Sequence, residues 1–191
     1  MKILSLQYPQ PGSGKPEIRL MADSSILLSE KPFFIPDFAD GFTVSATLAL
    51  RISRVGKCIA PRFAHRYFDS VTAAAVVTPQ GLHDNAVACN VATSTAFDGA
   101  LWLGTFVPVD GIDATNPQLE LAIEGTRQCT HTACRVPLSP ADIIAEVSRQ
   151  MMLKMGDIIL TGNATPCEPL AIGDTVTASL QGDERLRIRV K

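Results

Sequence analysis

Long apolar runs and a strong charge of either sign are both missing from this chain of 191 residues. No run approaches the roughly 18 apolar residues that a helix needs to cross a bilayer, so we expect no membrane partner. The net charge is -2, without the clustered basic face that nucleic acid attracts, so we expect no nucleic-acid partner either. The first apolar stretch ends at Pro9 and makes a poor signal peptide, which favours a cytoplasmic protein.

A disulfide framework is also absent from the sequence. The five cysteines are odd in number, scattered and without a CxxC pair, which is typical of reduced thiols in the cytosol. Soft metal ligands come close together only in CTHTAC, where Cys129 and His131 would share one face of a strand and Cys134 follows. A zinc site needs four ligands, or three plus water, and a Cys/His catalytic pair usually joins separate segments. We therefore keep Cys129, His131 and Cys134 only as an alternative site.

Common catalytic signatures are missing as well. The chain has no GxSxG nucleophile elbow, and LTGNATP (160–166) has neither the lysine nor the glycines of a P-loop. This segment reads as a strand end that runs into a turn. Its backbone N–H groups could bind an anion or a carboxylate, and a plain turn is the other interpretation.

Short strands dominate the predicted structure. One helix is clear over about 140–153, with Ser139 as N-cap, Pro140 at the first helical position and Asp142 at N3, and it ends before Gly156. A shorter helix is expected within 61–71 and a loop or weak helix over 82–96. Hairpins are expected over 25–36 and 174–190, and single strands over 44–54, 101–109, 118–125 and 157–162. The pattern predicts one α+β, mostly β domain over 18–191, after an irregular segment over 1–17.

The strand over 44–54 raises a question of its own. Val44, Ala46 and Leu48 alternate with Ser45 and Thr47, which is the period of a half-buried strand. Its outward face therefore begins with two small hydroxyl side chains and carries no acid.

Five segments in order resemble the fumarylacetoacetate hydrolase family. They are KPFFIPDF (31–38), LALRISRVGKCIAPRFAHRYFDSVT (48–72), FDGALWLGTFVPVD (97–110), LSPADIIAEVSRQMMLKMGDIILTG (138–162) and IGDTVTASLQG (172–182). The resemblance implies a β-rich roll or sandwich that dimerises and binds Mg²⁺ or Mn²⁺. It also implies an enzyme that hydrolyses, decarboxylates or isomerises small 2-oxo and 1,3-diketo acids.

The resemblance also places the family's functional residues on this sequence. The two glutamates of its E-x-E metal pair fall on Ser45 and Thr47, and its third metal ligand, an aspartate, falls on Val76, or on Ala75 after a slip of one residue. Its substrate-binding T-G-T-P turn survives only as Thr161 and Gly162. Further departures include a lysine replaced by Thr95, a K-P replaced by Met21–Ala22, a T-A-R-D motif replaced by residues 78–81, and an N-terminal segment shortened to a loop without histidine.

These replacements predict the loss of the metal centre. Mg²⁺ prefers octahedral oxygen ligands with carboxylate charge, which Ser45, Thr47 and Val76 do not supply. We therefore expect no metal cofactor and a non-catalytic homologue that binds a small carboxylate or serves as a partner subunit. It would act as a homodimer or as a heterodimer with an active relative. The alternative is an enzyme of the same substrate class with altered or metal-free chemistry.

Overall fold

Two β-sheets form the framework of the computed structural model, which describes residues 1–8, 16–82, 94–125, 129–133, 138–162 and 169–191. The strands are β1 Ile3–Gln7, β2 Glu17–Met21, β3 Ile26–Leu28, β4 Pro32–Phe33, β5 Ala39–Ile52, β6 Phe68–Leu82, β7 Leu101–Leu103, β8 Val107–Pro108, β9 Leu119–Glu124, β10 Cys129–Ala133, β11 Ile158–Leu160, β12 Thr175–Leu180 and β13 Asp183–Val190. The helices are α2 Pro140–Gln150 and the short 3₁₀ turns η1 Asp23–Ser25 and η2 Pro61–Arg66. The expectation of an α+β, mostly β fold is confirmed.

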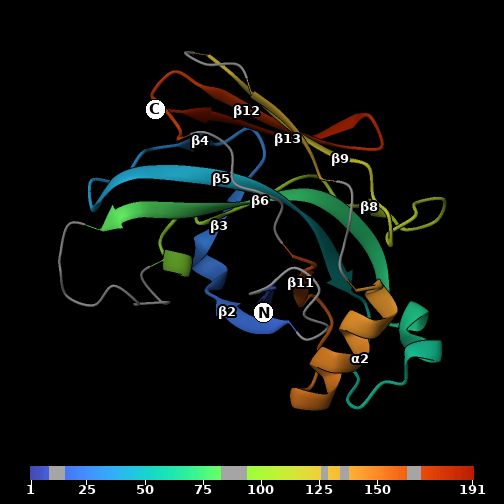
Figure 1. The fold of residues 1–191 in the computed structure, drawn as a ribbon. Helices are drawn as coiled ribbons and strands as arrows, with labels where there is room; N and C mark the ends of the chain where they lie inside the picture. Colours follow the sequence, from blue (N-terminus) through green and yellow to red (C-terminus); the bar gives the residue numbers. More distant parts are fainter. Residues whose placement is uncertain (9–15, 83–93, 126–128, 134–137, 163–168) are drawn as a thin grey trace.

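The larger sheet has eight strands in the described residues, with the path β2-β1-β11-β5-β6-β7-β3 and β8 beside β6. The smaller sheet has five, in the order β10-β9-β12-β13-β4. Figure 1 shows the long, curved β5–β6 pair across the middle of the view, with β9, β12 and β13 above it and α2 below its curved end. The parallel neighbours β1 and β11 lie about 150 residues apart in the sequence, so the N-terminal and C-terminal parts of the chain pair within the larger sheet.

The β5–β6 pair is buried on both of its faces. Val44, Ala46, Leu48 and Leu50 point into the main core, which also receives side chains from β9, β12, β13 and α2. The opposite face belongs to a second apolar cluster (Ile3, Met21, Ala49, Ala74, Val76, Ala100, Leu101, Leu103, Ile158 and Leu160). The sequence-based expectation of a half-buried strand is therefore wrong, because the two-residue period here separates two cores rather than core from solvent.

Helix α2 begins as the sequence predicts. The Ser139 hydroxyl accepts a hydrogen bond from the backbone N–H of Asp142 at 3.2 Å, and Pro140 occupies the first helical position. The helix ends at Gln150 rather than near 153, because Met151 takes an extended conformation (φ -142°, ψ 152°). This early stop frees residues 151–157 to reach back to the loop after β5.

Other expected elements differ from the structure. The hairpin expected over 25–36 is wrong, because β3 pairs with β7 in the larger sheet and β4 with β13 in the smaller one. The strand over 101–109 is split into β7 and β8, and the helix within 61–71 is only the turn η2 before β6 begins. Part of the segment expected to be irregular over 1–17 forms β1. Most of the stretch 82–96 lies outside the described residues.

The hairpin of β12 and β13 and the strands β9 and β11 are confirmed. Within the part of the chain that the structure describes, no helix has the length and apolar character that a membrane crossing requires.

Candidate functional site

Ser45, Thr47 and Val76 meet on one face of the β5–β6 pair. Ser45 lies directly opposite Val76, and Thr47 lies opposite Ala74. Directly opposed residues of two antiparallel strands point the same way, and residues two apart along a strand share a face. We call this side of the pair the hydroxyl face. Its central positions are Thr43, Ser45, Thr47, Ala74, Val76 and Thr78.

The hydroxyl face is closed to solvent. Ser45, Thr47 and Val76 are 3%, 1% and 5% exposed. The second apolar cluster covers this side of the sheet, with Phe97 and Phe106 packed against it. Any ion or ligand held at these three positions would therefore be largely stripped of water, which makes the charge of the surrounding side chains decisive.

The polar groups of the hydroxyl face are only partly satisfied. Gln80 donates from Nε2 to Oγ1 of Thr43 at 3.3 Å, and the Thr43 hydroxyl lies 3.5 Å from the carbonyl oxygen of Thr78. By contrast, Oγ1 of Thr47 is buried with no hydrogen-bond partner among the described residues. A buried hydroxyl of this kind is a cost to the fold unless a ligand or water satisfies it.

Charge is nearly absent from the hydroxyl face. From Gly41 to Arg51 on β5, and at the paired positions of β6, the only charged side chain on this face is Arg51, at its outer end. The Arg51 guanidinium lies over the Phe106 ring at 5.0 Å and 3.9 Å from the Asp69 carboxylate. Arg51 is about half exposed, so this ion pair belongs to the rim.

Thr161 and Gly162, which the sequence analysis places in a turn, directly follow β11, the next strand of the same sheet. The Thr161 N–H donates to the carbonyl oxygen of Leu48 at 3.0 Å, which anchors the turn directly beside Thr47. Gly162 has φ +127°, and a Cβ built there would lie 2.7 Å from the ring of Tyr8. The turn therefore requires glycine for two reasons, its backbone conformation and the close approach of an aromatic ring.

Tyr8 is a site residue that the sequence analysis missed. Its hydroxyl donates to the carbonyl oxygen of Thr161 at 3.4 Å, and burial raises the pKa of Tyr8 to about 12. The phenol therefore stays neutral at physiological pH. No local pattern announces this contact, because it depends on the parallel pairing of β1 with β11.

The residues that the resemblance places at the family's metal positions do not fit a divalent metal ion. Two neutral hydroxyls and one aliphatic side chain provide no carboxylate charge, and Mg²⁺ or Mn²⁺ would have to be held in a buried, nearly uncharged environment. Among the described residues, no cluster of three or more histidine, cysteine, aspartate or glutamate side chains could hold a metal. Thr95, which the resemblance aligns with the family's lysine, is half-buried and equally uncharged.

The strand that carries Cys129 and His131 belongs to the smaller sheet, and the described strands do not bring it to the hydroxyl face. Cys129 and His131 lie on β10, opposite Ile123 and Leu121, at the edge of the smaller sheet. Their side chains and all of Cys134 lie outside the described residues. The cluster therefore remains a sequence-based alternative.

The comparisons with known proteins define the class of protein. The model of the family described as fumarylacetoacetate (FAA) hydrolase, C-terminal, matches residues 4–191. The chain belongs to this family.

Two relatives of known name are similar to this chain in sequence. The mitochondrial oxaloacetate tautomerase FAHD1 of Arabidopsis thaliana is 28% identical over 185 residues, which cover 93% of this chain and 81% of that protein. The oxaloacetate tautomerase YcgM of Escherichia coli is 32% identical over 89 residues, but the match covers only 46% of this chain and 41% of YcgM.

Solved structures support the fold. The 5-carboxymethyl-2-hydroxymuconate delta-isomerase of Mycobacterium smegmatis has a TM-score of 0.79 at 21% identity, covering 99% of this chain and 78% of that one. The 2-hydroxyhepta-2,4-diene-1,7-dioate isomerase of Mycobacterium marinum has a TM-score of 0.80 at 22% identity, covering 99% and 73%. At this identity the likeness establishes the shared fold.

Proposed function

We propose that this chain is a non-catalytic member of the fumarylacetoacetate hydrolase family, which keeps the family fold without its metal-dependent activity. The observation that carries the proposal is the chemistry of the hydroxyl face. Ser45, Thr47 and Val76 converge there in register and are almost fully buried, and none of them carries a charge.

Electrostatics is the physical basis of the proposal. A buried divalent cation needs anionic ligands to offset the loss of its hydration, and neutral hydroxyls do not offset it. Without a bound ion the site lacks the electrophile that would stabilise an enolate, an effect worth several kcal/mol in metal enzymes. A neutral threonine at position 95 also leaves the site without the lysine's charge.

In place of catalysis, we propose binding of a small carboxylate or service as a partner subunit, in a homodimer or beside an active relative. The retained Thr161–Gly162 turn supports the first role, because it keeps its contact with β5 and with Tyr8. The shared fold supports the second role, since an inactive subunit still has to pack as its active relatives do.

A metal-free enzyme is the second candidate, and the tautomerases and isomerases among the relatives favour it. Tautomerisation requires only that a proton leave one atom and return to another, so a positioned acid and base suffice in principle. The Cys129, His131 and Cys134 cluster would be the source of those groups.

Activity measured with and without chelator tests the proposal. The purified chain would be assayed for tautomerisation and decarboxylation of oxaloacetate and for cleavage of acylpyruvates, first with Mg²⁺ or Mn²⁺ and then with EDTA. We expect background rates in both conditions. Turnover that requires the metal would overturn the proposal, and turnover that survives EDTA would favour the second candidate.

Restoring the acids tests the assignment of the positions. The triple variant Ser45→Glu, Thr47→Glu and Val76→Asp should bind Mn²⁺, seen as a rise in melting temperature on adding the ion. The matched control Ser45→Gln, Thr47→Gln and Val76→Asn has nearly the same volume without charge and should show no rise. Both would be refolded with and without Mn²⁺, because buried like charges destabilise the metal-free acidic variant. No response to Mn²⁺ in the acidic variant would contradict the assignment.

A further inference from the structure

Two loops that are distant in the sequence are bridged at one end of the molecule. The N–H of Gly56 donates to the carbonyl oxygen of Leu153 at 3.1 Å, and the N–H of Leu153 donates back at 2.9 Å. Figure 1 shows the segment after β5 beside the C-terminal end of α2, at the lower end of the view. We use the name basic tip for six of the exposed side chains of these loops: Arg54, Val55, Lys57, Met152, Lys154 and Met155.

Large apolar side chains of the basic tip stand in solvent. Val55, Met152 and Met155 are 57%, 48% and 73% exposed, whereas Leu153 between them is fully buried. Isolated apolar side chains on a surface are ordinary, but these three all lie within two residues of the Gly56–Leu153 bridge. The burial of Leu153 indicates that the loops are packed against the body of the protein, so the exposure is not a failure of packing.

The cations of the basic tip lack counter-charges. Arg54, Lys57 and Lys154 are exposed and have no ion-pair partner among the described residues. Neither 51–58 nor 149–156 contains an acid. The carboxylates of Asp157, Asp69 and Glu146 are each paired with another cation, namely Lys2, Arg51 and Arg149. The tip is therefore positive on a chain whose net charge is -2.

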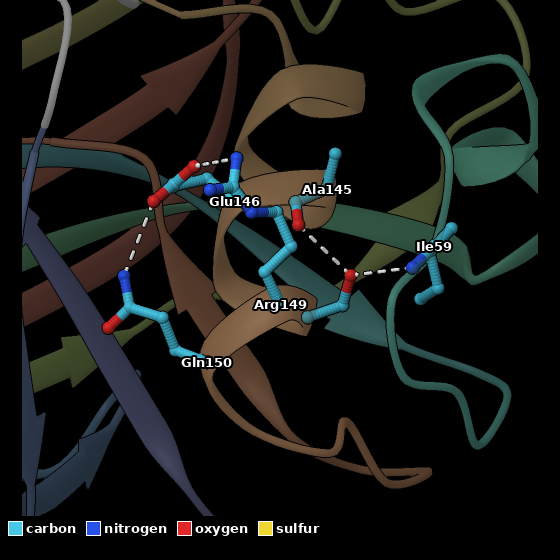
Figure 2. A network of polar contacts seen from close by, with 6 residues as sticks. Ile59, Ala145, Glu146, Arg149 and Gln150 are labelled. Atoms are coloured by element: carbon cyan, nitrogen blue, oxygen red, sulfur yellow. Dashed lines mark hydrogen bonds and ion pairs between the residues drawn. The ribbon is translucent and has the colours of Figure 1, made fainter.

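The loop of the basic tip that follows β5 is held rigidly. The buried Ser148 hydroxyl donates to the carbonyl oxygen of Ala145 at 3.1 Å and accepts from the N–H of Ile59 at 2.9 Å, and Figure 2 shows Ile59 and Ala145 facing each other across this link. A Cβ at Gly56 would lie 2.3 Å from the ring of Tyr67, so the loop is seated closely. A surface that is already ordered loses little conformational entropy on binding.

We propose that the basic tip docks on an anionic lipid surface. Exposed methionine and valine side chains enter the boundary between headgroups and acyl chains, while the surrounding cations attract anionic headgroups. Because the remainder of the chain is net negative as a whole, an anionic surface attracts the tip more strongly than the remainder, which favours one orientation. This peripheral contact departs from the sequence-based expectation of no membrane partner, which considered only spanning segments.

Vesicle flotation tests the proposal directly. At low ionic strength the whole chain should float with mixed phosphatidylserine–phosphatidylcholine vesicles and remain unbound with pure phosphatidylcholine. The variant Arg54→Gln, Lys57→Gln and Lys154→Gln should lose roughly a hundredfold in partition, at about fivefold per cation. Added salt should release the wild-type chain as well, because it screens exposed charges.

A charge-matched control separates the tip from a general attraction. Lys31→Gln, Arg189→Gln and Lys191→Gln remove three exposed cations near the β4–β13 edge, shown at the opposite end of Figure 1. This control should float like wild type. Equal losses in both triple variants would overturn the proposal, as would failure of the wild type to float.

The apolar contribution needs its own variant. Val55→Ser with Met155→Ser leaves the charge unchanged and should lower partition several-fold. An unchanged partition would contradict docking through apolar side chains. Binding of wild type to soluble polyglutamate with no binding to vesicles would overturn the lipid proposal and assign the tip to an acidic protein partner.

Discussion

The two faces of the β5–β6 pair differ in how much their burial contributes to the stability of the fold. Val44, Leu48 and Leu50 face the smaller sheet and bury only apolar atoms in the main core. The hydroxyl face is buried just as deeply, yet it includes Thr47, whose Oγ1 has no partner among the described residues. The side chains of both faces are equally inaccessible to solvent, and the two faces differ only in the buried polar atoms.

This difference indicates that the hydroxyl face was not built for stability alone. A side of a sheet that serves only as core gains most from aliphatic side chains, because each buried CH₂ contributes about 0.8 kcal/mol and each unsatisfied hydroxyl costs about 1–3 kcal/mol. The hydroxyl groups of Ser45 and Thr47 are therefore consistent with a face that held polar or charged side chains in an ancestral protein. This supports the proposed loss of a charged centre.

The largest expected effect comes from returning a single charge to the hydroxyl face. Thr47→Glu should destabilise the fold by about 3 kcal/mol more than Thr47→Gln at neutral pH, because the carboxylate is buried without a cation. Burial should raise the pKa of the new carboxyl group, so the penalty should shrink as the pH falls and vanish below about pH 4, where the group is protonated in both states. Urea unfolding of both variants across this pH range measures the difference.

The glutamine variant is the control for volume, since both side chains overfill the site by similar amounts. Equal stabilities of the two variants at neutral pH would mean that position 47 reaches solvent or a cation, and the buried, uncharged description of the face would then fail.

Apolar truncation compares the packing of the two faces. Leu48→Ala, in the main core, should lose about 3 kcal/mol of unfolding free energy, through lost transfer energy and a cavity. Val76→Ala, on the hydroxyl face, should lose about 1 kcal/mol, because fewer carbons are removed. Chemical denaturation gives both values. A larger loss at Val76 than at Leu48 would reverse the ranking.

Local chemistry predicted local structure well. The cap at Ser139 fixed the start of α2, and alternation located β5, β9 and the β12–β13 hairpin. The sequence patterns did not show which strands pair when they lie far apart along the chain. Nothing near residues 25–36 indicates that β3 and β4 belong to different sheets, and nothing near Tyr8 indicates its contact with Thr161.

The candidate site divides in the same way. The sequence identifies Ser45, Thr47 and Val76 through the resemblance. That they lie together on one face follows only from the register of β5 with β6. Their burial was not predicted, because alternation alone does not tell a second core from solvent.

A satisfied buried hydroxyl provides the reference for the unsatisfied one. Ser148 is fully buried, and its hydroxyl links α2 to the loop at Ile59 through the contacts in Figure 2. Ser148→Ala should lower the unfolding free energy by about 1–2 kcal/mol, because the buried N–H of Ile59 is left without a partner. Thermal unfolding monitored by circular dichroism measures the loss, and a neutral result would mean that water replaces the hydroxyl.

The smallest effect should have the opposite sign and occurs on the hydroxyl face. Thr47→Val replaces an unpartnered hydroxyl by a methyl group of similar size, so the variant should be more stable than wild type by about 1 kcal/mol. Urea unfolding under the conditions used for Ser148→Ala gives the comparison directly. A loss of stability at Thr47→Val would instead mean that the hydroxyl has a partner, such as an ordered water or a bound small molecule. Repeating the measurement after exhaustive dialysis and after adding oxaloacetate separates those two, since only a dissociable ligand makes the difference depend on the solution.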